Sequence, residues 1–439
     1  MLSFLDRDRS VAHPGFSRWL VPPAALAIHL SIGQVYAFSV FKNPLLALHA
    51  ADGSSWDLKE IGYIFSIAIA VLGLSAALFG KWLETAGPRK AMFVAATCFG
   101  SGFIVAAGGV LIHSLALIYL GYGVIGGIGL GLGYISPVST LIKWFPDRPG
   151  LATGLAIMGF GGGAMIGSPL GTRLMAYYKA TGHQPIAAAW VTMGILYFIF
   201  MMFGVFTVRV PQEGWKPAGW VPKAHQSALI SSHNVEVNTA FRTPQFWLLW
   251  LVLCLNVTAG IGILEQASPM IQDLFHGHVT AVAAAGFVGV LSLFNMLGRF
   301  FWASVSDFIG RKPTYMIFFI AGAVLYWILP VTGTAHLDSI PLFVLIAGVL
   351  ISMYGGGFAT IPAYLKRSLR HIPRQRHSWT PAHSLVYCRN RRPAHRQRDP
   401  RPLRRQSHPQ GAGLPRHSAH HDRPARRRLH RQPARAPGV

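Results

Sequence analysis

Residues 80–90 read GKWLETAGPRK, and residues 303–312 read ASVSDFIGRK. A small residue, an acid and a glycine recur in the two stretches with the same spacing: Gly80, Glu84 and Gly87, then Ala303, Asp307 and Gly310, 223 positions further on. Each stretch follows a long apolar run and carries an adjacent basic pair, Arg89 and Lys90 or Arg311 and Lys312. The chain therefore contains two related halves, and both run in the same direction.

The segments around these repeats are long enough to cross a membrane. The chain has 439 residues, of which 52% are hydrophobic and only 12% charged, against about 25% charged in a soluble domain. A spanning helix needs about 20 mostly apolar residues. Ten such segments are predicted, at 19–41, 60–82, 91–113, 116–140, 150–172, 187–209, 245–267, 280–304, 313–333 and 341–365. These features favour an all-α membrane protein.

The spacing of the segments predicts the domain organisation. We expect a six-helix N-terminal half over 1–209, a central loop over 210–242, a C-terminal half with helices 7–10 over 243–366, and a tail over 367–439. Lys and Arg gather in alternate short loops and in the central loop, and such loops face the cytoplasm. The sequence thus predicts a multi-pass protein of the inner membrane whose N-terminus is cytoplasmic.

Five stretches, two of which overlap, carry a family resemblance. The two repeated loops resemble the cytoplasmic loop motif of major facilitator transporters, although Glu84 replaces the usual aspartate in the first and Ala303 the leading glycine in the second. The stretches at 143–154 (KWFPDRPGLATG), 242–247 (RTPQFW) and 298–307 (GRFFWASVSD) resemble the oxalate/formate antiporter branch. The resemblance covers residues 15–366. It implies a major facilitator fold of two six-helix halves, with a substrate site between them near the midplane.

The same resemblance implies substrate-binding residues. An arginine of helix 8 binds the substrate carboxylate in that branch, and Arg299 matches it; Tyr36 and Tyr134 match hydroxyl-bearing cavity positions. Arg299 also precedes Asp307 by eight residues, which places it about 12 Å inside the helix end. A charge at that depth is costly unless it faces a cavity or a partner, and a guanidinium pairs well with a carboxylate. The alternative is a structural arginine bonded to backbone carbonyls.

The charged loop residues have two interpretations. Their carboxylates and guanidiniums could pair when the carrier faces outward and separate when the halves rock, as a conformational latch. Alternatively, they only set the topology of the chain. The latch residues are Gly80, Glu84, Gly87, Arg89, Asp307, Gly310 and Arg311.

Other residues within the spans are less specific. His29 and Glu265 are candidate proton relays, since intramembrane acids and histidines often mark proton paths; the alternative is a packed, hydrogen-bonded side chain. The glycine-rich runs at 126–133 and 159–163 lack the strand and the Lys-Ser/Thr pair of a phosphate loop. We interpret them as close-packing surfaces between helices 4 and 5. No spacing of Cys and His predicts a metal, and no cofactor is expected.

The tail departs abruptly from the apolar pattern. Residues 367–439 hold 19 Arg, 9 His and 10 Pro, a composition that cannot span a bilayer and is typical of GC-rich DNA read out of frame. Residues 366–393 can be translated back into DNA with a free choice of silent bases. When one nucleotide is deleted after codon 366, the shifted reading frame encodes a sequence that resembles helix 11 of the same branch. It places tryptophan where the oxalate transporter has a lysine as its second cation, which favours a monocarboxylate. The alternative is a basic tail that binds anionic lipid.

We therefore predict that the parent gene differs by one nucleotide near codon 366 and encodes twelve spans. Sequencing the source DNA across that codon tests the hypothesis. It is wrong if the frame stands as written and related chains end in the same arginine-rich tail.

Together these features predict a secondary transporter of a small organic anion of the formate, oxalate, lactate or pyruvate class, and not an enzyme. The expected partners are the carboxylate, the bilayer and either a co-transported proton or an exchanged anion; nucleic acid is not expected, because the basic excess is confined to the tail. We expect a monomer. The alternatives are a non-transporting membrane sensor on the same scaffold, or a truncated product without function. A membrane-embedded enzyme is disfavoured because residues 1–365 hold no clustered acids, metal set or nucleophile motif.

Overall fold

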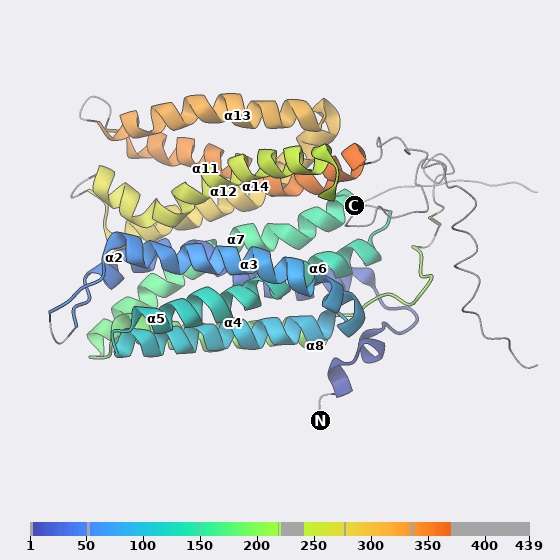
Figure 1. Cartoon of the computed structure of the whole chain (residues 1–439), viewed down its shortest axis with the longest axis horizontal. Helices are drawn as coiled ribbons and strands as arrows, with labels where there is room; N and C mark the ends of the chain where they lie inside the picture. Colours follow the sequence, from blue (N-terminus) through green and yellow to red (C-terminus); the bar gives the residue numbers. More distant parts are fainter. Residues whose placement is uncertain are drawn as a thin grey trace, which may run out of the picture. The chain divides into compact units, whose positions relative to one another are not determined.

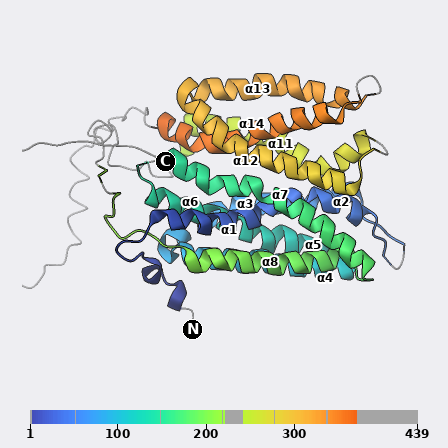
Figure 2. The ribbon, with the colours of Figure 1, turned by 180° about the vertical axis from the view of Figure 1, so that it is seen from behind.

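The computed structural model describes residues 3–50, 53–147, 149–217, 219–220, 241–275, 278–334 and 338–369. Within these residues ten helices are long and apolar enough to cross a membrane, so the ten predicted spans are confirmed. The helices run side by side across Figure 1 and are seen from behind in Figure 2. The hypotheses about the tail beyond residue 369, and most of the central loop, lie outside the described residues.

The N-terminal half contains the first six spans. The first is broken into α1 (Val21–Ile32), a 3-10 turn (Gly33–Ala37) and α2 (Ser39–Leu46). The remaining elements are α3 (Leu58–Ala86), α4 (Pro88–Leu111), α5 (Leu115–Ile118) with a π-helical segment (Tyr119–Ile125) and α6 (Gly126–Trp144), then α7 (Pro149–Ala180) and α8 (Pro185–Thr207).

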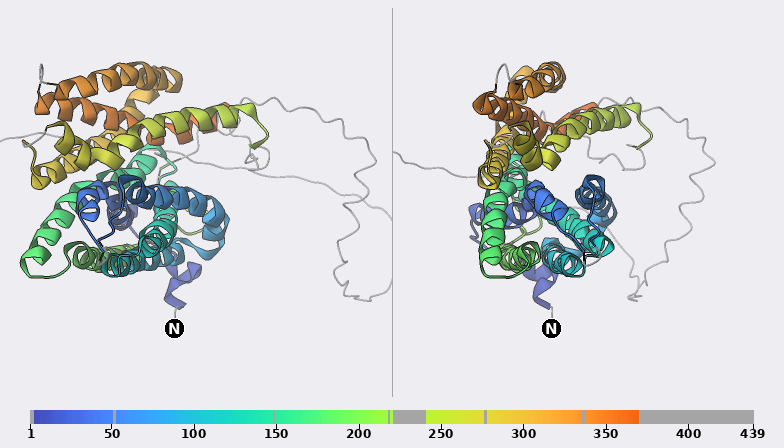
Figure 3. Two further views of the ribbon diagram at one scale, coloured as in Figure 1. Left: turned by 60° about the vertical axis from the view of Figure 1, so that its left-hand side comes forward. Right: turned by 90° about the vertical axis from the view of Figure 1, so that its left-hand side faces the viewer.

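The C-terminal half supplies α11 (Pro244–Leu274), α12 (Ala281–Ile309), α13 (Arg311–Ile328) with a 3-10 turn (Leu329–Gly333), and α14 (Ile340–Leu369). The starts of the helices follow local sequence. Asp57 and Glu60 form a capping box at α3, while proline opens α4, α8 and α11, where its missing N–H costs no helical bond. Figure 3 shows α1–α8 in blue to green and α11–α14 in yellow-green to orange.

The repeat is visible in the backbone. Gly87 separates α3 from α4 with φ 86° and ψ 158°, and Gly310 separates α12 from α13 with φ 92° and ψ 156°. This conformation is essentially restricted to glycine. The two glycines found by spacing alone therefore make the same sharp turn in each half.

These turns lie at the same end of the helices as residues 3–20, which we call the N-terminal end. The loop residues 47–50, 53–57, 112–114, 181–184 and 338–339 lie at the other, distal end. At the N-terminal end, Arg18 makes a bidentate ion pair with Asp147, at 2.6 and 3.0 Å. The pair ties the start of the first span to the loop after α6.

The two halves meet mainly where α7 packs on α12. Ser292 of α12 donates a hydrogen bond to the carbonyl of Gly161 at 2.7 Å, and Ser168 of α7 donates to that of Ala285 at 2.7 Å. Because serine is small, both bonds require the helix backbones to lie close together.

The glycine-rich runs are packing surfaces, as predicted, but the predicted partner helices are wrong. Glycines of the 126–133 run face α3, α4 and α1: a Cβ on Gly129, for example, would lie 2.6 Å from the backbone of Phe99. Glycines of the 159–163 run face α1 and α12. The correction follows from the helical period, because alternate glycines of one run point to different neighbours.

Candidate functional site

Arg299 is fully buried between the halves. Its side chain is 0% exposed. Its Nε donates to Asn295 Oδ1 at 3.1 Å, one turn earlier on α12, and a terminal nitrogen donates to the carbonyl of Ile157 on α7 at 3.0 Å. The guanidinium carbon lies 5.7 Å from the ring centre of Phe160 and 5.4 Å from that of Phe358. The charge is thus held by an amide, a carbonyl and two aromatic faces.

Among the described residues, no carboxylate lies within ion-pair distance of Arg299. Hydrogen bonds to neutral groups and cation–π contacts compensate a buried charge less fully than an anion does. The described surroundings therefore leave the charge of Arg299 only partly compensated.

Two glycines create the space for this side chain. A Cβ on Gly161 of α7 would lie 3.0 Å from Arg299 Nε, and one on Gly355 of α14 would lie 2.5 Å from the carbonyl of Asn295. Larger residues at either position would push α7 or α14 away from α12. The glycines thus bring three helices together around one cation.

The two tyrosines predicted by resemblance lie near Arg299, around the ring of Phe160. Tyr36 packs edge-on against Phe160 with ring centres 5.2 Å apart, and Tyr134 does the same at 5.2 Å. The Tyr36 hydroxyl lies 2.8 Å from that of Tyr354 on α14, which links the first span to the C-terminal half. Arg299, Tyr36 and Tyr134 thus share one aromatic neighbour.

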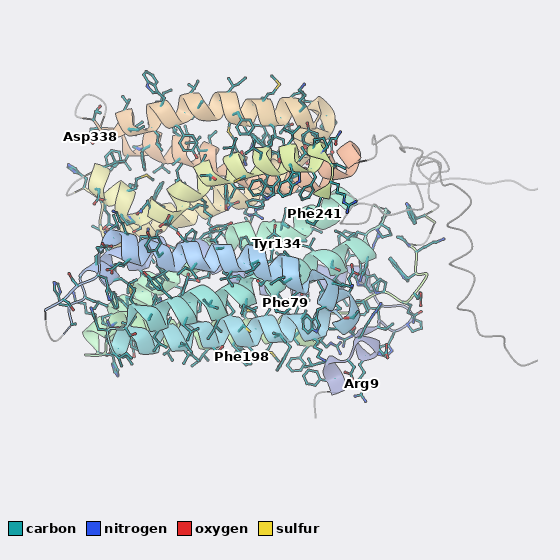
Figure 4. The ribbon with its side chains drawn as sticks, viewed as in Figure 1. Arg9, Phe79, Tyr134, Phe198, Phe241 and Asp338 are labelled. Atoms are coloured by element: carbon teal, nitrogen blue, oxygen red, sulfur yellow. The ribbon has the colours of Figure 1, made fainter. Side chains whose placement is uncertain are left out.

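A cavity of about 310 Å³ leads toward this cluster. Its lining includes Tyr134 and Val138 of α6, together with Gly80 and Glu84 in the last two turns of α3. In Figure 4, Tyr134 is labelled within the helices, between Arg9 near the N-terminus and Asp338 at the distal end. The cavity therefore connects a residue of the repeated loop with a residue of the central cluster.

His29 is packed rather than free. Its side chain is fully buried in α1, with Nδ1 in contact with the carbonyl of Ala156 and Nε2 3.1 Å from the carbonyl of Tyr134. These contacts correspond to the packed alternative, since both ring nitrogens face backbone acceptors. The proton-relay role of His29 stays a prediction.

Glu265 lies on α11 and pairs across the halves. Its Oε1 is 2.8 Å from Nζ of Lys42 on α2. The first span was predicted to end at residue 41, whereas Lys42 lies within α2 and is buried.

The two repeated loops are held differently. In the C-terminal half, Arg311 bonds to Asp307 and Ser306 within its own loop. In the N-terminal half, Arg89 donates to the carbonyls of Phe4, Arg9 and Val208 at 2.8, 3.1 and 3.2 Å, whereas Glu84 is exposed. No ion pair joins one loop to the other in the described part of the chain, so this conformation leaves the latch hypothesis a prediction.

Sequence reasoning missed four neighbours of the cluster: Asn295, Phe160, Tyr354 and Phe358. Asn295 carried a usable signal, because a polar amide one turn before an arginine in an apolar helix faces the same side. The other three carried none, since aromatic residues are as common on lipid-facing surfaces as in cavities.

Two groups of apolar helices that enclose a buried cation are the arrangement expected of a membrane transporter. The chain belongs to the Major Facilitator Superfamily, whose family profile matches residues 16–378. This confirms the family and the all-α fold that the repeated loops predicted.

Two relatives and one solved structure illustrate the similarity. The chain is 26% identical to an uncharacterized MFS-type transporter, YhjX, of Escherichia coli K12, over 79% of each chain. It is also 26% identical to the oxalate:formate antiporter of Oxalobacter formigenes, over 79% of this chain and 76% of that one. The fold resembles a bacterial homologue of the lysosomal transporter Spinster, with a TM-score of 0.57 and 17% identity over 82% of this chain and 79% of that structure.

Proposed function

We propose that this protein carries a small organic anion, of the formate, oxalate, lactate or pyruvate class, across the inner membrane by alternating access. The supporting observation is Arg299, a fully buried cation between the two halves without a carboxylate partner among the described residues. The similarity to an oxalate:formate antiporter supports the same substrate class. Exchange for a second anion or symport with a proton would drive the cycle.

The proposal includes an orientation. The N-terminal end carries Arg89, Lys90, Lys143, Arg311 and Lys312. Short basic loops stay in the cytoplasm during insertion. The N-terminal end would therefore face the cytoplasm, and the distal end would face outward. We further propose that the protein acts as a monomer.

Uptake measurements test the proposal directly. Two proteins would be reconstituted into proteoliposomes: the chain as it stands, and the protein encoded after one nucleotide is removed behind codon 366. Both would be supplied with labelled formate, lactate, pyruvate and oxalate. We expect saturable uptake of at least one anion, inhibited by the others. Absence of uptake and of binding for all four, in both versions, would contradict the substrate class.

A second experiment addresses the latch. The Asp307 carboxylate bonds to Arg311 at the turn between α12 and α13, remote from Arg299 along the helix. Asp307→Asn should therefore slow uptake while it leaves the affinity for the anion nearly intact, and Glu84→Gln should act in the same way. Initial uptake rates and equilibrium binding separate the two effects; tenfold weaker binding with preserved turnover would rule out the latch role.

A further inference from the structure

Lys42 is a fully buried lysine in the first span. Its side chain is 0% exposed, although it carries a charge that is costly to remove from water. Its Nζ lies 2.8 Å from Glu265 Oε1 on α11. The Glu265 side chain is 23% exposed, so the acid is the more exposed member of the pair. Because α2 and α11 belong to different halves, this ion pair bridges the interface.

The pair lies on the distal side of the central cluster. Lys42 follows Tyr36 by six residues in the broken first span, which places it about 9 Å nearer the distal end. A Cβ on Gly62 of α3 would come within 3.1 Å of Glu265 Oε1. Three helices, α2, α3 and α11, therefore close around the pair between the central cluster and the distal surface.

Among the described residues, the N-terminal end has no equivalent link. There the ion pairs of the described residues are Arg18 with Asp147 and Arg311 with Asp307, and each stays within one half. The ionic connection between halves is thus found at the distal side alone, as far as the described residues extend. A cavity reaches Tyr134 from the opposite side.

We propose that Lys42 and Glu265 form the outer gate of the transport path. The pair holds α2 against α11 while the cavity opens toward the N-terminal end, and it separates when the halves rock to admit an anion from the distal side. Separation exposes Lys42 to water, which hydrates its charge and offsets the loss of the pair. The proposal rests on the alternating access and the orientation proposed above.

A reporter cysteine beneath the gate tests this. Ser39 is buried one turn before Lys42 on α2, so Ser39→Cys would be introduced into the full chain after Cys98, Cys254 and Cys388 are replaced by serine. A membrane-impermeant thiol reagent is added to right-side-out vesicles. We expect slow labelling in this parent, and labelling at least about tenfold faster with Glu265→Gln, because an unpaired buried lysine destabilises the closed gate.

Two further variants make the result specific. Reversing the pair, with Lys42→Glu and Glu265→Lys together, should restore labelling to within about threefold of the parent, because coupled residues compensate. Lys59→Met, which alters an exposed lysine at the start of α3, should leave the labelling rate unchanged. If Glu265→Gln is not recovered as a folded protein, the neutral pair Lys42→Met with Glu265→Gln replaces it and should also label faster than the parent.

The proposal is overturned if the folded Glu265→Gln protein or the neutral pair labels at the parent rate. It is also overturned if the reversed pair labels as fast as Glu265→Gln. The labelling rates could follow these expectations while the protein neither binds nor transports any of the four anions. That result would support the gate and contradict the proposed substrate class.

Discussion

Arg299→Gln is expected to weaken binding of the transported carboxylate by about ten- to a hundredfold, because hydrogen bonds to charged groups contribute roughly 1.5–3 kcal/mol. The bound anion would neutralise a guanidinium that contacts an amide, a carbonyl and aromatic rings, and that has no carboxylate partner among the described residues. Glutamine keeps a donor at this position but loses the charge. Arg299→Lys keeps the charge but loses the planar guanidinium, so its affinity for the anion should fall between those of the parent and of Arg299→Gln.

The measurement is equilibrium binding and uptake of labelled formate, lactate, pyruvate and oxalate by the purified protein and the two variants. Arg18→Gln is a matched control, since it removes another arginine with a defined partner, Asp147, away from the cavity. Its affinity for the anions should equal that of the parent. If Arg299→Gln binds and transports every anion as well as the parent, Arg299 is a structural residue and the proposed substrate class loses its main support.

The sequence predicted the ten spans because each is a long apolar run, and it predicted the repeat because Gly87 and Gly310 occupy positions that only glycine tolerates. It also predicted the burial of Arg299, since the depth of a charge follows from its distance to a helix end. These inferences need only one helix at a time. To predict the partners of Arg299, or the pairing of Lys42 with Glu265, one must know how several helices pack against one another.

Which faces of the helices meet could not be predicted, for a physical reason. In a soluble protein, polarity distinguishes the outer face of a helix from the inner one. In a bilayer both faces are apolar, so packing is set by small residues and polar contacts instead of by the hydrophobic pattern. On α12, Phe300 is 57% exposed while the neighbouring Gly298 is buried, and nothing in the apolar run separates them. The same ambiguity led to the wrong partner helices for the two glycine-rich runs.

The glycine contacts themselves give the second large expected effect. Gly163→Ala should destabilise the folded protein by about 1–3 kcal/mol, because a methyl group forced into a packed interface shifts the surrounding backbone. A Cβ at this position on α7 would lie 2.3 Å from the backbone carbon of Gly33, at the 3-10 turn of the first span. Backbone cannot move aside as a flexible side chain can, so α7 and the first span would have to separate.

That separation would also reach the substrate site. The turn that contains Gly33 carries Tyr36, and α7 carries Phe160 and the carbonyl that binds Arg299. Gly163→Ala should therefore lower both the thermal unfolding temperature and the affinity for the anion. Gly73→Ala is the control, because Gly73 is exposed on α3 and a Cβ there meets no atom within 4 Å. It should leave the affinity unchanged and raise the unfolding temperature slightly, because alanine favours a helix over glycine. Equal unfolding temperatures for Gly163→Ala and Gly73→Ala would show that the close approach of α7 to the first span does not stabilise the fold, and that the cluster around Arg299 is positioned by other contacts.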